Sequence, residues 1–473
     1  MSDKNPAIVW FRRDLRLADN PALDEAIKTK KPLILLYILE QGVSRNMGGA
    51  KQVWLHHSLT SLKADIENKG GQLILRRGHP VEILEDIIAQ TGADTLHWNR
   101  RYDKAARDVD EGIKSNLQGH GLNVESHNGN LLVEPWEVKN KTGNYYKVFT
   151  PFWRAARANF TLPNLRPTPH SLTCYSETLE CDDLEGWRLL PTQPDWGADM
   201  IAHHQPGEAG ATARLTSFLD GPIQSYADQR DRPDDETGTS KLAPHLAHGE
   251  ISPRQIWQAT IDRQGDVDKF LSEIGWREFS YLLLFYNSEL ATQNFKSAFD
   301  NFEWSSDEAK VEAWRRGQTG YPLIDAGMRE LWQTGWQHNR VRMVCASFLI
   351  KHLLTDWRVG EAWYWDTLLE ADPASNAASW QWVAGSGADA APYFRIFNPF
   401  GQGQKFDPNG DYVKKYVPEL ARLPKKYIHT PWEAPQHILE AAGVVLGKTY
   451  PKSIVDHKWA RERALAAYKK SRA

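Results

Sequence analysis

The chain has 473 residues and a formal net charge of −3 at pH 7. This length allows about two or three domains with large cores. The near-zero charge excludes a globally basic protein, so contacts with nucleic acid would need a local basic patch. Three cysteines (Cys174, Cys181 and Cys345) show neither metal-ligand spacing nor an even-numbered disulfide framework, which favours a reducing compartment. With no signal-peptide pattern and no apolar run of membrane-spanning length, we expect a cytoplasmic protein without a membrane partner.

The first part of the chain, residues 1–130, alternates short apolar runs with amphipathic segments. The runs typical of strands are Ala7–Phe11, Pro32–Leu39, Gln72–Arg76, Thr95–Asn99 and Asn123–His127. Lys51–Lys69 and Pro80–Gln90 have the periodicity of helices. This alternation predicts a parallel, Rossmann-like α/β domain. Phe11–Leu17 contains no G-x-G-x-x-G after the first strand, so a standard dinucleotide-binding fold is not indicated.

The next segment, residues 131–207, is rich in Pro, Thr, Asn and acidic residues and is predicted to be a linker that runs over the surface. From residue 208 to residue 473 the pattern is helical, without strand-like alternation. The segments predicted to be helices are Ala211–Leu219, Pro253–Arg263, Val267–Glu289, Ala309–Arg316 and Tyr321–Trp332. The sequence therefore predicts an all-α domain over 208–473.

The segment from Glu370 to Trp382 has the most specific pattern in the chain. It holds two acids (Glu370 and Asp372), then Asn376, then the tryptophans Trp380 and Trp382. Taken alone, these residues predict only a helix and a turn with aromatic side chains in a core. The chain has 20 tryptophans in all, a composition useful to a protein that handles light, electrons or stacked bases.

In its order and spacing this segment, with its continuation over Asp389–Asn398, resembles the flavin-binding core of the DNA photolyase/cryptochrome family. The resemblance implies carboxylates that anchor the polar side of a flavin, an amide that hydrogen-bonds its ring, and aromatic rings that pack on it and pass electrons. Four further motifs extend the resemblance to nearly the whole chain. They are Arg12–Leu17 followed by Asp19 and Asn20, Tyr145–Phe152, Thr319–Asp325 and Gly335–Met343. The resemblance implies an N-terminal α/β antenna domain and a C-terminal helical domain that binds FAD.

The resemblance also implies which residues hold the FAD. These are Tyr226, Thr239, Ser240, Lys241, Leu242, Ala243, Arg342, Glu370, Ala371, Asp372 and Asn376. Thr239 and Ser240 precede a predicted helix, where hydroxyls and unpaired backbone N–H groups bind pyrophosphate; an ordinary helix cap is the alternative. Two positions depart from the family pattern. Ala243 stands where Ser is frequent, and Glu370 stands where Asp is usual, which would change its pairing with Arg342.

The residues implied to act on the substrate are Glu273, Trp276, Asn339, Met343, Asn376 and Trp382. Glu273 and Trp276 are three positions apart and so share one helix face. The implied roles are a hydrogen bond from Glu273 to the damaged bases and a flat wall from Trp276, whereas Glu278 is interpreted as a structural ion-pair partner. Asn339 and Met343 stand where photolyases for 6-4 photoproducts carry histidines, which favours a cyclobutane pyrimidine dimer.

The amide of Asn376 is implied to face N5 of the flavin, where signalling members often have an acid or a cysteine; this favours repair. Trp304, Trp357 and Trp380 match the family's electron-transfer chain, and Trp314, Trp363 and Trp365 would allow a branched route. Residues implied to contact DNA, beside those that contact the lesion (Glu273, Trp276 and Asn339), are Arg230, Arg340, Arg395 and Lys405.

A second, antenna chromophore is less well defined by the sequence. Arg45-Asn46-Met47 lacks the His that some folate-binding members have before Asn-Met, and the run from Asp103 to Asp108 lacks their Glu. Methenyltetrahydrofolate, bound near Trp98, Arg101 and Asp103, is favoured over a deazaflavin. A second flavin and an empty site remain open.

The resemblance thus implies a monomeric, FAD-dependent, light-driven lyase that splits cyclobutane pyrimidine dimers in UV-damaged DNA and needs no metal for that reaction. One alternative is a cryptochrome-like photoreceptor, against which Glu273, Trp276, Asn339 and Asn376 argue, as does, more weakly, the end of the chain at Ala473. The other is a repair enzyme restricted to single-stranded DNA.

Overall fold

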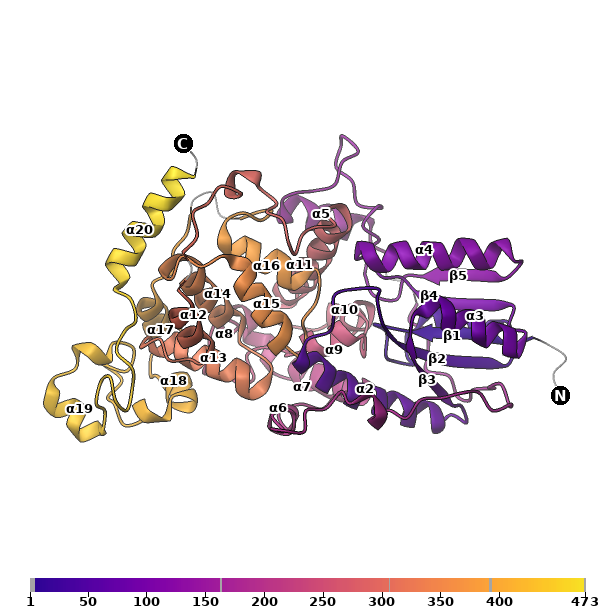
Figure 1. Ribbon diagram of the computed structural model, residues 1–473, viewed down its shortest axis with the longest axis horizontal. Coiled ribbons are helices and arrows are strands. Elements are labelled where there is room, and N and C mark those ends of the chain that lie inside the picture. Colours follow the sequence, from indigo (N-terminus) through magenta and orange to yellow (C-terminus); the bar gives the residue numbers. More distant parts are fainter. Residues whose placement is uncertain (1–4, 162–163, 306, 391–393, 472–473) are drawn as a thin grey trace. The chain divides into compact units, whose positions relative to one another are not determined.

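The computed structural model describes residues 5–161, 164–305, 307–390 and 394–471, so positions 391–393 of the Asp389–Asn398 motif lie outside the described residues. The chain forms two compact units, Met1–Gly221 with Ser240–Ser288, and Pro222–Thr239 with Glu289–Ala473. A parallel α/β part followed by helices, as predicted, is confirmed (Figure 1). The domain bounds 1–130, 131–207 and 208–473 stay a prediction.

The first unit contains a five-stranded parallel sheet in the order β3-β2-β1-β4-β5. The strands are β1 (Ala7–Phe11), β2 (Leu33–Glu40), β3 (Leu73–Gly78), β4 (Thr95–Asn99) and β5 (Asn123–His127). Ala7 pairs with Leu33 on one side and with Thr95 on the other. All five predicted strands are confirmed. β1 and β2 read as almost continuous apolar runs because both of their faces are covered, whereas the edge strand β5 has a single apolar residue, Val124.

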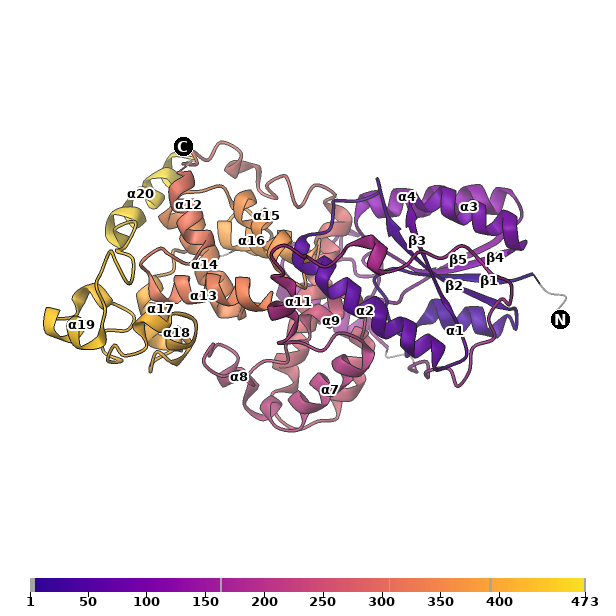
Figure 2. The ribbon, with the colours of Figure 1, turned by 60° about the horizontal axis from the view of Figure 1, so that its bottom comes forward.

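Helices cover both faces of this sheet (Figure 2). They are α1 (Pro21–Lys28), α2 (Gly49–Glu67), α3 (Pro80–Thr91) and α4 (Lys104–Gly119). Val9 and Leu35 pack with Leu59 of α2 on one face. Their neighbours in the strands point the other way, so that Trp10 packs with residues of α3 and α4.

Residues 131–207 are less superficial than predicted. They contain α5 (Phe149–Asn159), the short helix η1 (Glu185–Trp187) and α6 (Gly197–Ile201). Phe149 and Phe152 of α5 are buried, and Cys174 forms an isolated parallel bridge with Leu33. The segment is covered because its aromatic residues pack on helix α11 (Val267–Tyr286), a contact that its polar average composition conceals.

The first unit also includes a group of helices that follows α6. They are α7 (Glu208–Leu219), α9 (Ala243–His248), α10 (Pro253–Ile261) and α11 (Val267–Tyr286). The Arg12–Leu17 motif joins them to the sheet: Arg16 donates to the carbonyl oxygen of Gly249 at 2.8 Å. Asp19 accepts from Ser252 Oγ at 2.6 Å and from Arg254 Nε at 3.0 Å, and Ser252 caps α10.

The second unit is helical throughout its described part and surrounds one large apolar core. Its α-helices are α8 (Tyr226–Gln229), α12 (Glu308–Arg315), α13 (Pro322–Thr334), α14 (Asn339–Ser347), α15 (Trp357–Thr367), α16 (Ser375–Ala384), α17 (Pro399–Phe406), α18 (Asp411–Tyr416), α19 (Gln436–Ala442) and α20 (His457–Lys470). Shorter turns are η2 (Pro222–Ser225), η3 (Ser297–Phe299), the π-helix η4 (Phe348–His352), η5 (Pro418–Leu420) and η6 (Pro431–Glu433). No helix among the described residues is both long and apolar enough to cross a membrane.

Candidate functional site

An ion pair joins Arg342 to Glu370, the first residue of the predicted flavin-binding segment, in the second unit. Arg342, on α14, donates through Nη2 to Glu370 Oε1 and through Nε to the carbonyl oxygen of Gln337 at 2.6 Å. The predicted pairing is confirmed. Glu370 Oε2 is buried and has no hydrogen-bond partner within the described parts of the chain. Burying a charged oxygen without a donor is costly, so this atom marks a position for a donor of a bound ligand.

Asp372 fixes the start of α16. Its Oδ1 accepts from the backbone N–H groups of Ala374 at 3.0 Å and Ser375 at 2.7 Å. Its carbonyl oxygen accepts from the backbone N–H of Asn376 at 3.0 Å. An acid at this position satisfies N–H groups that have no partner inside the helix and complements the helix dipole. Asp372 therefore holds Asn376 in the first turn of α16.

The side-chain amide of Asn376 has a fixed orientation. Its Nδ2 donates to both the carbonyl oxygen of Glu361, at 3.1 Å, and Glu361 Oε1, at 2.8 Å. Because both partner atoms are acceptors, the amide nitrogen must face them and Oδ1 must face away. Glu361 was not predicted as a site residue. The sequence signal for it was weak: an acid among the tryptophans Trp357, Trp363 and Trp365, with nothing to indicate its partner.

The tryptophans predicted to carry electrons lie on α15, on α16 and before α12. The ring of Trp380 lies against Gly360, where an added Cβ would meet the ring at 2.1 Å. Trp357 is one helical turn before Gly360, so the structure brings Trp380 and Trp357 to the same face of α15. Both are buried, whereas Trp304 is partly exposed and contacts Phe302, with ring centroids 4.3 Å apart.

A branch also begins at Trp380. Its ring centroid lies 5.0 Å from that of Tyr364 and 6.4 Å from that of Trp314, both in edge-on geometry. Trp363 stacks on the exposed Trp332 with a centroid separation of 6.1 Å. These aromatic contacts are compatible with the branched route that the extra indoles suggested.

Three of the four predicted phosphate contacts gather around Phe406 and Asp231. The Arg340 guanidinium and the Lys405 ammonium both lie over the Phe406 ring, 4.5 and 4.9 Å from its centroid. Arg340 pairs with Asp231 at 2.5 Å, and Arg230 lies 3.9 Å from the same carboxylate. Arg395 is exposed and contacts Phe397 instead. We call Arg230, Arg340 and Lys405 the basic patch.

The other lesion residues of the second unit occupy α14 and α16. Asn339 Nδ2 lies 4.0 Å from Met343 Sδ, one turn along α14, so the two side chains share one face as predicted. Trp382 is half-buried and donates through Nε1 to the carbonyl oxygen of Asp389 at 3.1 Å. This bond fixes the indole plane of Trp382.

In the first unit, α11 carries Glu273 and Trp276. Trp276 stacks on Phe149 of α5, with ring centroids 3.8 Å apart and an interplanar angle of 9°. Phe279 meets its edge at 5.9 Å. Glu273 is half-buried and lies 3.6 Å from Lys269, one turn earlier. One face of the indole is thus held rigidly by Phe149, as a flat binding wall requires.

The turn from Thr239 to Ala243 does not behave as an ordinary helix cap. Helix α9 begins at Ala243 with Leu242 at the cap position and no side-chain cap bond, so that alternative is wrong. Lys241 has a φ of +49°, which an L-residue adopts at a cost. Thr239 Oγ1 is buried and has no hydrogen-bond partner among the residues that the structure describes. An orphaned hydroxyl and a strained turn fit a bound phosphate group.

Two residues suggested for the antenna chromophore are part of the domain core. Trp98 is buried and packs edge-on against Trp10, with ring centroids 5.9 Å apart. Arg101 is buried between Glu40, at 2.6 Å, and Asp110, at 2.7 Å, and these carboxylates raise its pKa. The structure therefore argues against Trp98 and Arg101 as chromophore contacts, because neither presents an exposed surface.

Glu278 has the structural role that the sequence indicated. Its carboxylate accepts from the backbone N–H groups of Leu132 at 2.8 Å and Val133 at 3.3 Å and lies 3.3 Å from Arg277. Burial raises its pKa from 4.5 to about 7, although Arg277 opposes this. The side chain fixes the segment after β5 on α11 and is not directed at a substrate.

We expect Glu278→Gln to raise stability above neutral pH. Since the pKa is about 7 in the folded chain and 4.5 in the unfolded chain, the folded state binds more protons between these values. Stability therefore falls as pH rises through this window. The amide oxygen of glutamine can still accept from both N–H groups, and no charge is buried. Arg277 still has a partner, because it donates to the carbonyl oxygen of Asn130 at 2.7 Å. The variant should gain about 3 kcal/mol at pH 8 and less than about 0.5 kcal/mol at pH 4.5.

Denaturant titrations at both pH values, with the flavin-loaded protein, measure this difference. An unchanged pH slope in the variant would show that Glu278 is already ionised in the folded state at acid pH.

Comparisons with known proteins agree with this site. Residues 7–171 match the family model described as DNA photolyase, and residues 270–470 match the model for the FAD binding domain of DNA photolyase. A deoxyribodipyrimidine photo-lyase of Agrobacterium fabrum is 53% identical over 98% of this chain and 97% of its own. Cryptochrome-1 of Arabidopsis thaliana is 38% identical, over 97% of this chain and 69% of its own.

Solved structures give the same result. The crystal structure of a bacterial class III photolyase from Agrobacterium tumefaciens superimposes with a TM-score of 0.96 at 52% identity, covering 100% of this chain and 98% of that one. A parallel α/β domain, an FAD-binding helical domain and these relatives define a flavoprotein of the light-dependent repair and photoreceptor class. The chain belongs to the DNA photolyase family.

Proposed function

We propose that this chain is an FAD-dependent, light-driven DNA repair lyase that splits cyclobutane pyrimidine dimers in UV-damaged DNA. The observation that carries the proposal is the arrangement of Arg342, Glu370 and Asn376, in which an orphaned carboxylate oxygen and an oriented amide fit a flavin. The 53% identity to a deoxyribodipyrimidine photo-lyase supports the reaction. When bound and reduced, FAD supplies under light the electron that opens the cyclobutane ring and then recovers it.

The chain's own residues bind, orient and exclude water. Asn376 presents Oδ1, the atom opposite Glu361, as a hydrogen-bond acceptor for the N5 side of the flavin, and Glu361 prevents the amide from rotating. Thr239 and Ser240 hold the pyrophosphate. Arg342 holds Glu370 in place through their ion pair. These contacts fix the cofactor before any substrate arrives, so that the reaction itself needs no rearrangement of the protein.

Glu273 and Trp276 receive the damaged bases. The face of Trp276 opposite Phe149 packs on the dimer, and Glu273 hydrogen-bonds the base edges. Asn339, Met343 and Trp382 supply the remaining contacts. Turning the dimer out of the duplex costs a few kcal/mol, less than for intact bases, because damaged bases are already poorly stacked.

The basic patch contacts the DNA backbone. Arg230, Arg340 and Lys405 provide the phosphate contacts and therefore affinity that falls with added salt, while the lesion residues provide selectivity. Arg395 makes a separate contact. The chain acts as a monomer in the cytoplasm. Methenyltetrahydrofolate is the favoured antenna chromophore, with contacts other than Trp98 and Arg101.

The direct test uses an oligonucleotide that contains one thymine cyclobutane dimer. Reduced protein should restore intact thymines under blue or near-UV light and not in darkness. Matched single- and double-stranded substrates distinguish a general repair enzyme from one restricted to single strands. No repair by flavin-loaded, reduced protein would direct attention to 6-4 photoproducts and then to the photoreceptor function that the 38% identity to Cryptochrome-1 suggests.

Trp304→Phe should reduce photoreduction of the oxidised protein to a small fraction of the wild-type rate. The partly exposed Trp304 is the proposed last carrier, and phenylalanine is much harder to oxidise than tryptophan. Flavin absorbance under continuous light measures the rate, and Trp459→Phe, at a tryptophan with 53% exposure on α20, is the control. Chemically reduced variant should still repair. An unchanged rate would assign the last step to the branch through Trp314 and Tyr364.

A further inference from the structure

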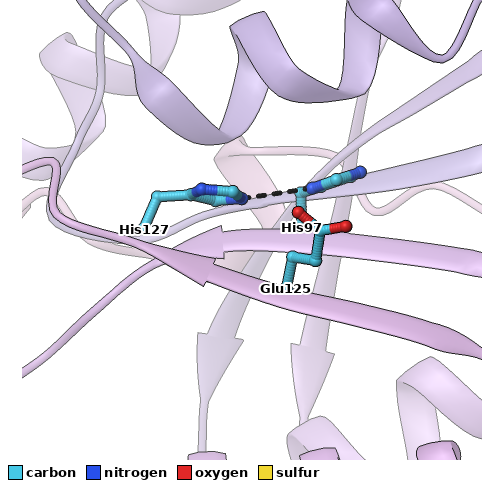
Figure 3. A group of neighbouring side chains, drawn as sticks. All are labelled: His97, Glu125 and His127. Atoms are coloured by element: carbon cyan, nitrogen blue, oxygen red, sulfur yellow. Dashed lines mark hydrogen bonds between the residues drawn. The ribbon is translucent and has the colours of Figure 1, made fainter.

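Three potential metal ligands lie close together on β4 and β5, the last two strands at one edge of the sheet. His97 is on β4, and Glu125 and His127 are on the edge strand β5 (Figure 3). His97 pairs in register with Glu125, and His127 is two residues further along β5. Side chains two residues apart in a strand point to the same face, so the pairing directs all three toward one another. None of these residues has a part in the proposed flavin chemistry.

The distances fit a single ion. His97 Nδ1 and His127 Nε2 are 3.2 Å apart, and one donor atom from each of the three residues lies within 4.8 Å of the others. A tetrahedral zinc ion with Zn–N bonds of about 2.0–2.1 Å separates its ligand atoms by roughly 3.3 Å. The two imidazoles are therefore already spaced as two ligands of one ion, and a carboxylate oxygen of Glu125 lies within 4.8 Å of both as the third.

We propose that His97, Glu125 and His127 bind one divalent transition-metal ion of the zinc class, with water in the fourth position. Two imidazole nitrogens and one carboxylate are a donor set that zinc accepts, whereas magnesium and calcium require oxygen ligands throughout. The two nitrogen donors therefore favour a zinc-class ion over magnesium or calcium.

The surroundings orient the ligands, and no fourth protein ligand joins the three among the described residues. Asn123 donates to Glu125 Oε1 at 2.8 Å, which holds the carboxylate as outer partners hold metal ligands. Glu25 of α1 interacts electrostatically with both imidazoles, but it is engaged by Lys28 at 2.9 Å and by Arg166 at 3.9 Å. The fourth position is therefore assigned to water.

The nearby cations Lys31 and Arg100 do not prevent a metal ion from binding by electrostatic repulsion. Lys31 pairs with Asp94, and Arg100 pairs with Glu134 at 2.5 Å, so each is neutralised by its own carboxylate. The alternative is a plain hydrogen bond between the two imidazoles, which needs no contribution from Glu125. The ion would link the edge strand β5 to β4. Because it binds only the folded state, it would stabilise the first unit by an amount that rises with the concentration of free metal ion.

The test is a titration of flavin-loaded, chelator-treated protein with Zn²⁺ by calorimetry and with Co²⁺ by absorption spectroscopy. We expect one equivalent to bind, with the intense visible bands of four-coordinate Co²⁺. Because an outer partner alone is worth about 10- to 100-fold in affinity, loss of a ligand in Glu125→Gln or His127→Gln should weaken binding by at least about 100-fold. His120→Gln and Glu111→Gln, at exposed positions of the same unit, are matched controls and should bind like wild type.

Equal affinity in Glu125→Gln and wild type, or no saturable binding by wild type, would overturn the proposal and leave the imidazole hydrogen bond. Glu125 is exposed, so its variant should fold even if His127→Gln does not. Flavin absorbance and light-dependent repair verify folding, and both should be unchanged in Glu125→Gln. A fall in binding without a change in repair separates this site from the proposed function.

Discussion

Replacing Arg342 with glutamine should lower the free energy of unfolding by about 3 kcal/mol and release most of the flavin. Glu370 is buried and its second carboxylate oxygen already lacks a protein partner among the described residues. Removal of Arg342 would leave this charge wholly uncompensated, and breaking a buried pair from one side costs about 3–5 kcal/mol. The lower value applies because the Arg342 side chain is 25% exposed. The flavin-to-protein absorbance ratio and a denaturant titration measure the two effects.

The reverse substitution and the double variant separate charge from packing. Glu370→Gln leaves an arginine that water can reach, so it should cost less than Arg342→Gln. The double variant should recover part of the loss, because no buried charge remains. Glu370→Asp, the residue usual in the family, should retain flavin if Arg342 can follow the shorter side chain. Equal losses from both single variants, with no recovery in the double variant, would contradict the ion-pair explanation.

The sequence predicted this pair but not the partner of Asn376. Arg342 and Glu370 lie in two motifs that the family resemblance identifies independently. Glu361 lies in neither, and only the packing of α15 against α16 brings its carboxylate to the amide 15 residues later. Similarly, strands β1 and β2 can be predicted from sequence because burial on both faces makes them apolar, whereas the edge strand β5 is mostly polar. The burial of helix α5 could not be predicted, because polar residues surround its aromatic residues in the sequence. Only the fold shows that these aromatic residues pack on α11.

For the antenna site the sequence suggested residues that the structure places in the domain core. Trp98 and Arg101 have the side chains that a chromophore pocket uses, but these groups serve the domain itself: an indole in the core and a guanidinium between Glu40 and Asp110. Residue type alone does not reveal whether a group is already satisfied by the fold. The sequence identified the basic residues of the patch but not that they lie together. They do so around Phe406 and Asp231, and neither of these residues belongs to a motif that the sequence analysis used.

Glu273→Ala should lower repair per absorbed photon about fivefold, with a smaller loss of affinity for the dimer. A hydrogen bond to a base edge that gains negative charge is stronger in the charged state than in the ground state, so its loss affects ring opening more than binding. A net hydrogen bond of about 1 kcal/mol corresponds to about fivefold. Glu273 is placed for this role on the same face of α11 as Trp276, whose other side is fixed by Phe149.

Quantum yields measured with chemically reduced protein at saturating substrate give the first quantity, and binding in darkness gives the second. Glu273→Gln keeps a donor and should recover much of the yield, whereas Asp268→Ala, at an exposed position of the same helix, should change neither. Trp276→Ala removes a wall rather than a hydrogen bond, so it should mainly reduce the preference for damaged over intact DNA. If Glu273→Ala reduces yield and affinity equally, the carboxyl group only helps to bind the dimer, and stabilisation of the opening ring must come from other residues.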